Sequence, residues 1–479
     1  MSGTEGVSRV SLPSFVLSIC LAGTVVGSAA ERWRFLMTCD SRGSSITGTN
    51  EQVLTEQVNE ALARRVDLMI FPGDLVYGAR ISPPRFEDQL RNWVRAMEPL
   101  YRAGVAVYAC RGNHEVGDAW DIDWGILPDP VDNYSTRWLN VFGQDGDPGP
   151  KLPGNGPANA KYMSYSVVHK NALLVAVDEY GGMRQWLAHS VDQAWLDSVL
   201  RDNTKPHVFV FGHEPAFQVL HPDCLDDHPA QRDAFWRSLK ASGARTYFCG
   251  HDHFYNHARI DDGDGDPNND VHQLVAATAG GPRYSWTPPY AGDNGDFSVS
   301  LVHHAEHYGY IVVEVNDLDV TLTWMERRDD DLRLPGVYEA KETWGYRVPA
   351  GPVVLQPNGG ERLPAGRPYT VRWRTIDGVE IKRVLVEYSL DGGENWVLVD
   401  EVSNTGTHEW IPPAADSGQA LVRVRDADNG ALSDTSDSLF SIAQCQNQLA
   451  ADVNGDCRVD FADLAILASQ WLAGGHPPD

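Results

Sequence analysis

The stretch Val66-Asp67-Leu68-Met69-Ile70-Phe71-Pro72-Gly73-Asp74 places a carboxylate directly after an apolar run of strand length. Such a run predicts a buried β-strand, and open α/β sheets bind ligands just beyond the carboxyl ends of their strands. A Gly-Asp turn also has a purely local role, in which glycine permits the bend and aspartate bonds to nearby backbone. Asp74 by itself does not separate these two interpretations.

Four further segments place potential metal ligands after predicted strands. They are Cys39-Asp40-Ser41-Arg42, Gly112-Asn113-His114-Glu115, Gly212-His213-Glu214-Pro215 and Gly250-His251-Asp252-His253. We expect these segments to meet around Asp74, which could bridge two cations. Two carboxylates, one amide and three imidazoles form a mixed oxygen and nitrogen set that suits two transition-metal or zinc ions. The candidate ligands are Asp40, Asp74, Asn113, His213, His251 and His253.

The elements around these segments alternate between strands and helices. We expect strands at 33–39, 66–70 and 105–110, and helices at 51–65 and 85–102. This βαβαβ alternation predicts the parallel sheet of an α/β domain. Ser190 and Gln193 form a capping-box pattern that predicts a further helix through Leu200. Later strands, at 271–277, 311–315 and 320–324, follow one another without helices, so the second half should add an antiparallel layer.

Two irregular stretches interrupt this alternation. Residues 116–160 are rich in Asp, Gly, Pro and Trp and show no period, which predicts a functional rim or lid. Trp120, Trp124 and Tyr134 are candidates for its wall, or they only pack the loop onto the body. Alternating carboxylates from Asp261 to Asp266, followed by Asp270, could hold Ca²⁺ or form a solvated acidic hairpin loop.

Length and charge limit the possible classes of protein. A chain of 479 residues predicts two or three domains. Its net charge of −27 is spread along the chain, which argues against binding to nucleic acid or to an anionic membrane, because both need basic patches. The same charge suits a soluble secreted protein and sites for hard cations.

The N-terminal 30 residues have the pattern of a signal peptide. Arg9 supplies a positive charge, residues 12–26 are mostly apolar, and Ser28-Ala29-Ala30 offers small residues for cleavage. We therefore expect a secreted protein, extracellular or periplasmic, with association with the cell surface as a further option. The run is short for a membrane anchor, and no later run has the length and apolarity of a span.

The residue pattern of the sequence changes near residue 350. Residues 350–443 carry alternating strands and turn signals without a helical period, which predicts a β-sandwich of about immunoglobulin size. Its opening, Pro357-Asn358-Gly359-Gly360-Glu361, resembles accessory Ig-like modules of secreted bacterial proteins.

The last segment, residues 445–479, contains oxygen side chains at EF-hand spacing. They fall at loop positions 1, 3, 5, 9 and 12, and an apolar helix pattern follows. The segment resembles a dockerin repeat, which implies a cohesin-type partner. It has one repeat rather than the usual two, and Cys457 replaces the usual loop glycine. A disulfide between Cys445 and Cys457 is expected, because so small a module lacks a good core. The calcium loop comprises Asp452, Asn454, Asp456, Arg458, Asp460 and Asp463.

Over residues 31 to about 330, the order and spacing of the five segments resemble the calcineurin-like metallophosphoesterases, and in particular their purple acid phosphatase branch. The branch features are Tyr77, three residues after Asp74, and Val210, three before His213. The resemblance implies two packed β-sheets flanked by helices, within a catalytic domain that we place at 31–345. It also implies a first metal on Asp40, Asp74, Tyr77 and His253, and a second on Asp74, Asn113, His213 and His251.

Arg42 and His114 are the expected catalytic residues. The wider family has histidine, and the purple branch usually glycine, where this chain has Arg42. A guanidinium stays protonated and is not a metal ligand, so we expect Arg42 either to clamp a phosphate oxygen or to pair with a surface carboxylate. His114 has a family role on the substrate side, where it stabilises the phosphoryl group or protonates the leaving oxygen.

These observations predict a secreted binuclear phosphatase of phosphomonoesters, in which metal-bound hydroxide attacks phosphorus. The expected metals are Fe³⁺, favoured by a phenolate from Tyr77, with Zn, Mn or Fe as the second ion; Zn²⁺ or Mn²⁺ in both positions is the alternative. A phosphodiesterase or nucleotidase of the same fold is the alternative within the enzyme class. A non-catalytic surface-binding protein with structural metals is the alternative outside it.

Overall fold

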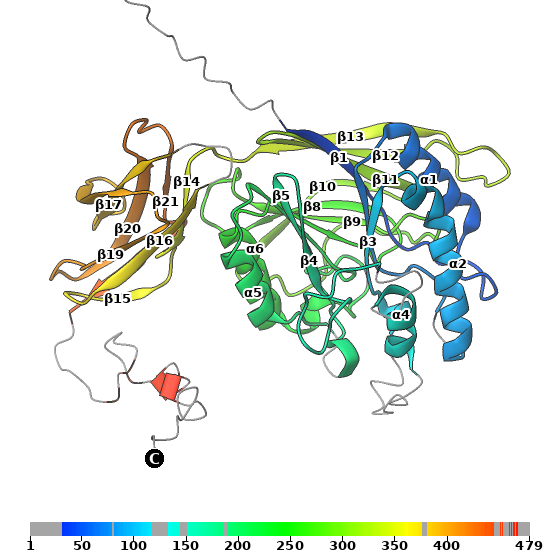
Figure 1. Ribbon diagram of the computed structural model, residues 1–479, viewed down its shortest axis with the longest axis horizontal. Helices are drawn as coiled ribbons and strands as arrows, with labels where there is room; N and C mark the ends of the chain where they lie inside the picture. The colour runs from blue at the N-terminus through cyan, green and yellow to red at the C-terminus, as the bar shows by residue number, and fades with distance from the viewer. Residues whose placement is uncertain are drawn as a thin grey trace, which may run out of the picture. The chain divides into compact units, whose positions relative to one another are not determined.

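A computed structural model describes residues 31–78, 81–116, 133–143, 151–184, 189–375 and 381–444, with single positions between 451 and 467 (Figure 1). The expected leader at 1–30 lies outside the described residues, as do Trp120, Trp124, Cys445 and Cys457. In the described part of the chain, no helix has both the length and the apolar character needed to cross a membrane.

The first sheet joins a parallel half to an antiparallel half. Strands β1, β2 and β3 run parallel, while β1 pairs antiparallel with β11, which continues antiparallel into β12 and β13. The order across the sheet is β13 (Tyr338–Arg347), β12 (Asp319–Arg327), β11 (Gly309–Asn316), β1 (Arg32–Met37), β2 (Leu68–Pro72) and β3 (Ala106–Cys110). The strands expected at 311–315 and 320–324 are confirmed and are longer than expected.

The second sheet is also mixed. Strands β5, β6, β7 and β9 run parallel, and antiparallel strands flank them on both sides. Its order is β10 (Ser298–Ala305), β8 (Tyr255–Asp261), β9 (Val271–Ala276), β7 (Thr246–Cys249), β6 (His207–Phe211), β5 (Ala172–Ala176) and β4 (Tyr165–His169).

The two sheets share one hydrophobic core, as expected. Phe35 of β1 packs edge-on against Phe209 of β6 and Phe248 of β7, with ring centroids 5.1 and 5.9 Å apart. All three rings are fully buried. Since burial of a large apolar side chain is worth about 1.5–3 kcal/mol, this aromatic group contributes substantially to holding the sheets face to face.

Helices α1 (Glu51–Arg64) and α2 (Pro83–Arg102) lie beside the first sheet, and α5 (Gln193–Arg201) and α6 (Pro229–Ala241) beside the second (Figure 1). The Asn50 side chain caps α1 by accepting from the Val53 amide. On α2, Trp93 packs edge-on against Phe71 of β2 at 5.2 Å. The apolar faces expected from helical periodicity are therefore the buried ones.

Two expectations were wrong. Residues 133–143, predicted without regular structure, contain α4 (Tyr134–Phe142), and Tyr134 is buried, with its ring stacked on Phe86 of α2 at 4.3 Å. Its hydroxyl donates to the backbone of Gly78 and Ile81, so Tyr134 packs the structure rather than lining a site. Helix α5 is capped by Asp192, which accepts from the Trp195 amide, and not by Ser190.

The C-terminal region is rich in β-structure. Its strands form one sheet in the order β14 (Pro352–Gln356), β16 (Tyr369–Thr375), β19 (Thr407–Trp410). The second has the order β15 (Arg362–Pro364), β22 (Phe440–Ala443), β20 (Ser417–Asp426), β17 (Arg383–Ser389), β18 (Val397–Ser403), with β21 (Ser433–Thr435) on β20. Val371 and Trp373 of the first sheet share a buried core with Val384 and Val422 of the second. A sandwich of two sheets follows, as the alternating pattern predicts.

Of the expected calcium loop, the structure describes Asp463, which is 2% exposed and accepts from the Val453 amide at 2.7 Å. Asp452, Asn454, Asp456, Arg458 and Asp460 lie outside the described residues.

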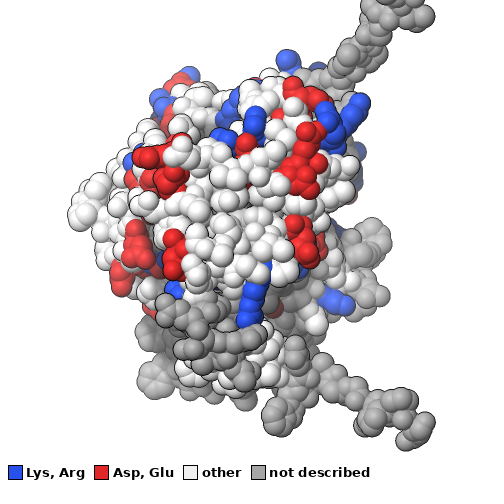
Figure 2. All heavy atoms as spheres, turned by 90° about the vertical axis from the view of Figure 1, so that its left-hand side faces the viewer, with Lys and Arg blue, Asp and Glu red and all other residues white. Residues whose placement is uncertain are grey.

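Surface charge on the face drawn in Figure 2 is mixed: basic side chains lie singly among acidic clusters, and no continuous basic surface covers the described residues there. In the C-terminal β-rich region, Arg383 pairs with Glu401 and Arg425 with Glu387.

Candidate metal centre

The five segments singled out by sequence follow the carboxyl ends of parallel strands in both sheets. Asp40 follows β1, Asp74 follows β2, and Asn113 opens a 3₁₀ turn (Asn113–Glu115) after β3, all in the first sheet. His213 and His251 follow β6 and β7 in the second sheet. The site therefore lies where two sheets present their strand ends together, as expected for ligand sites in α/β folds.

Asp74 lies at the middle of this group and is 1% exposed. Its Oδ1 atom lies 3.5 Å from His213 Nε2 and accepts from the His114 amide at 3.1 Å. Its Oδ2 atom lies 3.9 Å from Arg42 Nε. A side chain at Gly112 would place its Cβ 2.3 Å from Asp74 Oδ1, so this close approach requires glycine.

Asp40 brings the first sheet into contact with the end of β7. Its Oδ1 atom lies 3.2 Å from His253 Nε2, and its Oδ2 atom accepts from the His251 amide at 3.3 Å. Asp40, Asp74 and His251 have φ values of 61°, 48° and 70°. Non-glycine residues in this left-handed region carry a backbone cost of order 1–3 kcal/mol each and are typical of functional sites.

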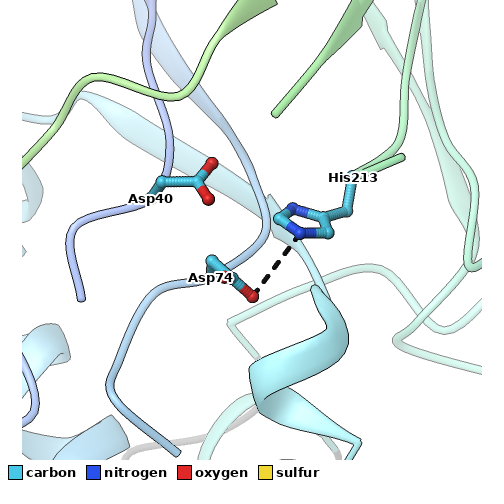
Figure 3. A group of neighbouring side chains, drawn as sticks. All are labelled: Asp40, Asp74 and His213. Atoms are coloured by element: carbon cyan, nitrogen blue, oxygen red, sulfur yellow. Dashed lines mark ion pairs between the residues drawn. The ribbon is translucent and has the colours of Figure 1, made fainter. Parts of the chain in front are cut away.

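His213 is held in one orientation by its ring nitrogens. The Nδ1 atom lies 2.9 Å from the Pro72 carbonyl, which can only accept, so Nδ1 carries the proton. The unprotonated Nε2 atom then faces Asn113 Oδ1 at 3.1 Å and Asp74. Figure 3 shows Asp40, Asp74 and His213 converging from three chain segments. A histidine whose second nitrogen donates to a carbonyl is the usual arrangement of a metal ligand.

The electrostatics of the centre favour cations. Burial by itself would raise the pKa of Asp74, but His114, His213 and Arg42 hold it well below the usual range. Burial would lower the pKa of His251, but Asp223, whose Oδ1 lies 3.4 Å from its Nε2, raises it to about 10 together with Asp252 and Glu214. Negative charge therefore outweighs positive charge around the His251 ring.

The residues present fit a metal site. Ligand atoms of Asp40, Asp74 and His213 all lie within 4.8 Å of one another. Asp40 Oδ1 and His251 Nε2 are buried and make no hydrogen bond of regular geometry, although Asp40 Oδ1 faces His253 Nε2 at 3.2 Å and His251 Nε2 faces Asp223 Oδ1 at 3.4 Å. Buried polar atoms are rarely left without a partner, and an ion is one explanation for such atoms. Carboxylate, amide and imidazole donors form a set that transition metals bind.

Arg42 lies inside this centre, on the side of Asp74 Oδ2. Its Nε atom donates to His253 Nε2 at 3.1 Å, its Nη2 to Tyr284 Oη at 2.7 Å, and its Nη1 contacts His114 Nε2. A metal bound to His253 Nε2 would require the guanidinium to move aside, because both need the same lone pair. The alternative of a surface ion pair is wrong, since Arg42 contacts buried site residues.

His114 and Tyr77 are neighbours at the edge of the centre. The His114 Nδ1 atom contacts the Tyr77 carbonyl, and the two rings meet edge-on at 6.3 Å. Burial lowers the pKa of His114, and Asp74 opposes that effect. The neutral ring is protonated at Nδ1, which leaves Nε2 directed at Arg42.

Sequence reasoning missed the carboxylates that hold the ligand-bearing turns. Glu115 accepts from the Gly112 and Val76 amides, at 2.8 and 3.1 Å. Glu179 accepts from the His213 amide at 2.7 Å, and burial and Glu214 raise its pKa. Glu115 could have been found from its place beside His114, whereas Glu179, 34 residues from His213, carries no local signal.

Tyr284 was also missed. Its ring stacks on His253 at 4.4 Å between centroids, with an interplanar angle of 5°, and its hydroxyl accepts from Arg42. It lies in a segment without periodicity, so only the tertiary fold brings it to the centre.

Comparison with known proteins agrees with this geometry. Residues 48–255 match the model of the calcineurin-like phosphoesterase family. No curated protein matches the chain. The solved structure of PhoD is 11% identical over 67% of this chain and 71% of its own, with a TM-score of 0.47.

Two further solved structures are similar. The purple acid phosphatase PPD1 from yellow lupin (Lupinus luteus) seeds is 13% identical, over 67% of this chain and 54% of its own, with a TM-score of 0.46. GAP50, the anchor in the inner membrane complex of Plasmodium, is 13% identical over 66% of this chain and 89% of its own, with a TM-score of 0.41. From the two packed sheets, the ligand set at their strand ends and the family match, we conclude that this chain contains a calcineurin-like phosphoesterase domain.

Proposed function

We propose that this protein is a secreted, binuclear metal-dependent phosphatase that hydrolyses phosphomonoesters. The observation that carries the proposal is the position of Asp74. Its Oδ1 atom faces His213, and its Oδ2 atom faces Arg42 and His114. A carboxylate whose oxygens face opposite sides of one buried centre can bridge two cations.

In this proposal Asp40, Asp74, Tyr77 and His253 hold a first ion, and Asp74, Asn113, His213 and His251 hold a second. Fe is proposed for the first position, and Zn, Mn or Fe for the second. When bound, the two ions would supply a hydroxide nucleophile at near-neutral or acidic pH and neutralise charge on the phosphoryl oxygens.

The chain's own residues orient the substrate and move its proton. Arg42 presents a planar, permanently charged donor to the phosphoryl oxygens, provided that it leaves His253 Nε2. His114 would carry a proton on Nε2 and deliver it to the leaving oxygen, while Nδ1 stays on the Tyr77 carbonyl. Positioned acids of this kind typically contribute about 10²–10⁴-fold to rate.

We further propose that the segments flanking the catalytic domain determine where the enzyme acts. Residues 1–30 would direct export and 31–345 would form the catalytic domain. Residues 350–443 would serve as an Ig-like spacer, and 445–479 as a dockerin-like, calcium-binding module with a cohesin-type partner. The support is the leader pattern and the EF-hand spacing in the sequence.

The test combines metal content with turnover. We expect about two metal ions per chain by mass spectrometry, and faster turnover of p-nitrophenyl phosphate than of bis(p-nitrophenyl) phosphate. His114→Gln should keep both ions and lower kcat at least tenfold. Asp202→Asn, a change at an exposed carboxylate, is the control and should alter neither.

Faster turnover of the diester would replace the proposal with a phosphodiesterase. Full metal content without turnover of either ester would favour a binding protein with structural metals. A chain that binds no transition metal would end the proposal altogether.

A further inference from the structure

A second group of carboxylates lies in the hairpin that joins β8 to β9, and the metal centre does not use it. Ligand atoms of Asp261, Asp262 and Asp270 lie within 4.8 Å of one another. Asp261 ends β8 and Asp270 directly precedes β9, so the antiparallel pairing of these strands brings the two together. Acidic clusters on hairpins are common without an ion, and the cluster alone therefore identifies no site.

The burial of Asp270 is the second observation. Asp270 is 3% exposed, and both of its carboxylate oxygens are buried without a hydrogen-bond partner. Arg259 Nε lies 3.6 Å from Asp270 Oδ2, which is too long for a hydrogen bond. A buried carboxylate with four unused acceptor positions is costly unless an ion or another donor binds it.

The charge around the hairpin is not balanced by the chain. Lys240 is paired with Asp262 and Asp264, the latter at 2.7 Å, and Arg259 lies near Asp261 and Asp270. Arg245 donates to the Asn269 carbonyl. Five carboxylates against these three cations leave two negative charges, the charge that one divalent ion would neutralise. The five carboxylates are Asp261, Asp262, Asp264, Asp266 and Asp270.

The rest of the loop is already shaped by its own side chains. Asp261 accepts from the Gly263 amide at 2.7 Å, and Asp264 accepts from the Asp266 amide at 2.7 Å. Asn269 Oδ1 is a further buried oxygen without a hydrogen-bond partner. The β8–β9 loop would therefore need little change in conformation to bind a cation.

We infer that the β8–β9 hairpin binds one Ca²⁺ ion through Asp261, Asp262 and Asp270. The donors in the cluster are all carboxylate oxygens, which suit Ca²⁺ and not the softer metals that select sulfur or nitrogen. Ca²⁺ also accepts six to eight oxygens in irregular geometry, whereas Mg²⁺ requires near-octahedral coordination and keeps several waters.

The titration of Asp270 supports this inference. Burial, together with the negative charges of Asp261, Asp262 and Asp264, raises the pKa of Asp270 to about 6 even though Arg259 opposes the shift. At neutral pH, the ionised form of Asp270 is therefore destabilised when no cation is bound.

The ion would stabilise a hairpin whose strands lead into the metal centre. Strand β8 begins two residues after His253, and the end of β9 and the segment after it bond to the backbone around Asp40. The contacts are Cys39 N to Ala276 O at 3.2 Å and Gly281 N to Asp40 O at 2.8 Å. We assign the ion a structural role, because none of its three ligands contacts the metal centre.

The test uses the full chain carrying Asp452→Ala, so that the C-terminal loop does not contribute calcium binding. After treatment with EGTA and desalting, calorimetry with CaCl₂ should detect one ion per chain. Asp270→Asn should weaken this binding at least tenfold, and Asp261→Asn should weaken it too. Calcium should raise the Tm of the parent and leave that of Asp270→Asn unchanged.

Two controls separate this site from others. Asp202→Asn makes the same change in charge at an exposed position and should bind like the parent. Asp74→Asn alters the metal centre and should also keep the calcium site.

Four results would overturn the inference. They are no calcium uptake by the parent, unchanged binding in both hairpin variants, loss of binding in Asp74→Asn instead, or an equal rise in Tm with MgCl₂. Since Asp270→Asn removes a buried charge, we expect it to fold; if it does not, Asp261→Asn, which is partly exposed, decides.

Discussion

The ion pair between Arg111 and Asp178 offers the sharpest test of how the two sheets hold the metal centre. Both side chains are fully buried, and Arg111 donates from Nε and Nη2 to the two oxygens of Asp178 at 2.7 and 2.9 Å. Arg111 follows β3 and precedes Gly112, whereas Asp178 follows β5 and precedes Glu179. The pair thus joins the turn that bears Asn113 to the residue that holds the His213 amide.

Asp178→Asn keeps the volume of the side chain but leaves a buried guanidinium without its counter-charge. Breaking a buried pair in this way costs about 3–5 kcal/mol. For a domain of this size, each kcal/mol shifts Tm by about 2–4 °C, so the variant should lose on the order of 10 °C.

The double variant Arg111→Met with Asp178→Leu provides the matched comparison. Replacing both charges by apolar groups is often nearly neutral. Here Ser135 Oγ and the Gly182 carbonyl would each lose a donor and the Gly182 amide its acceptor, at about 1–3 kcal/mol for each group left unsatisfied. We expect the double variant to lose less stability than the sum of the losses of Arg111→Met and Asp178→Leu, with an interaction energy of about 2 kcal/mol.

The assay is urea denaturation of the wild type, of Asp178→Asn, of the single variants Arg111→Met and Asp178→Leu, and of their double variant, with metal content measured on each. If Asp178→Asn lies within about 1 kcal/mol of the wild type, or if the two single losses simply add, the pair does not join the sheets as argued.

Three further changes test the proposed site. Arg42→Ala should reduce kcat/KM at least tenfold, because a charged donor to phosphate is lost, while mass spectrometry still finds both metals; a lost metal or wild-type kinetics would refute the clamp. If Tyr77 binds Fe³⁺, protein expressed with iron should absorb visible light and Tyr77→Phe should be colourless but folded; a colourless, fully active wild type with only divalent metal would exclude iron. Asp452→Ala should remove one Ca²⁺ from the full chain by calorimetry, and an unchanged stoichiometry would mean that the C-terminal loop binds none.

Local patterns in the sequence determined much of the fold. The apolar run before Asp74 predicted a buried strand, and the spacing of Leu90, Trp93 and Met97 predicted a helix packed on the sheet. Such patterns are reliable because strand and helix periodicity follow from backbone geometry alone. They failed at residues 133–143, where Tyr134 anchors a short helix through contacts with Phe86 and with the backbone of Gly78.

The candidate metal ligands were also predictable, because each of them follows a recognisable strand and carries metal-binding chemistry. Asp40 and Asp74 come together because β1 pairs with β2, and His213 joins them because β6 of the second sheet packs against β1. The candidate ligands could be recognised in the sequence, whereas their assembly into one site depends on the packing of the two sheets.

Only the tertiary structure decided what surrounds those ligands. Tyr284 stacks on His253, Glu179 holds the His213 amide, and Arg42 donates to His253 rather than to a surface carboxylate. These contacts join residues 31, 34 and 211 positions apart. No local pattern encodes them, since they arise from the packing of two sheets whose strands are distant in the chain. The same holds for Asp270, whose place after an acidic run suggested a solvated loop as readily as a calcium site, and whose burial is a property of the folded hairpin alone.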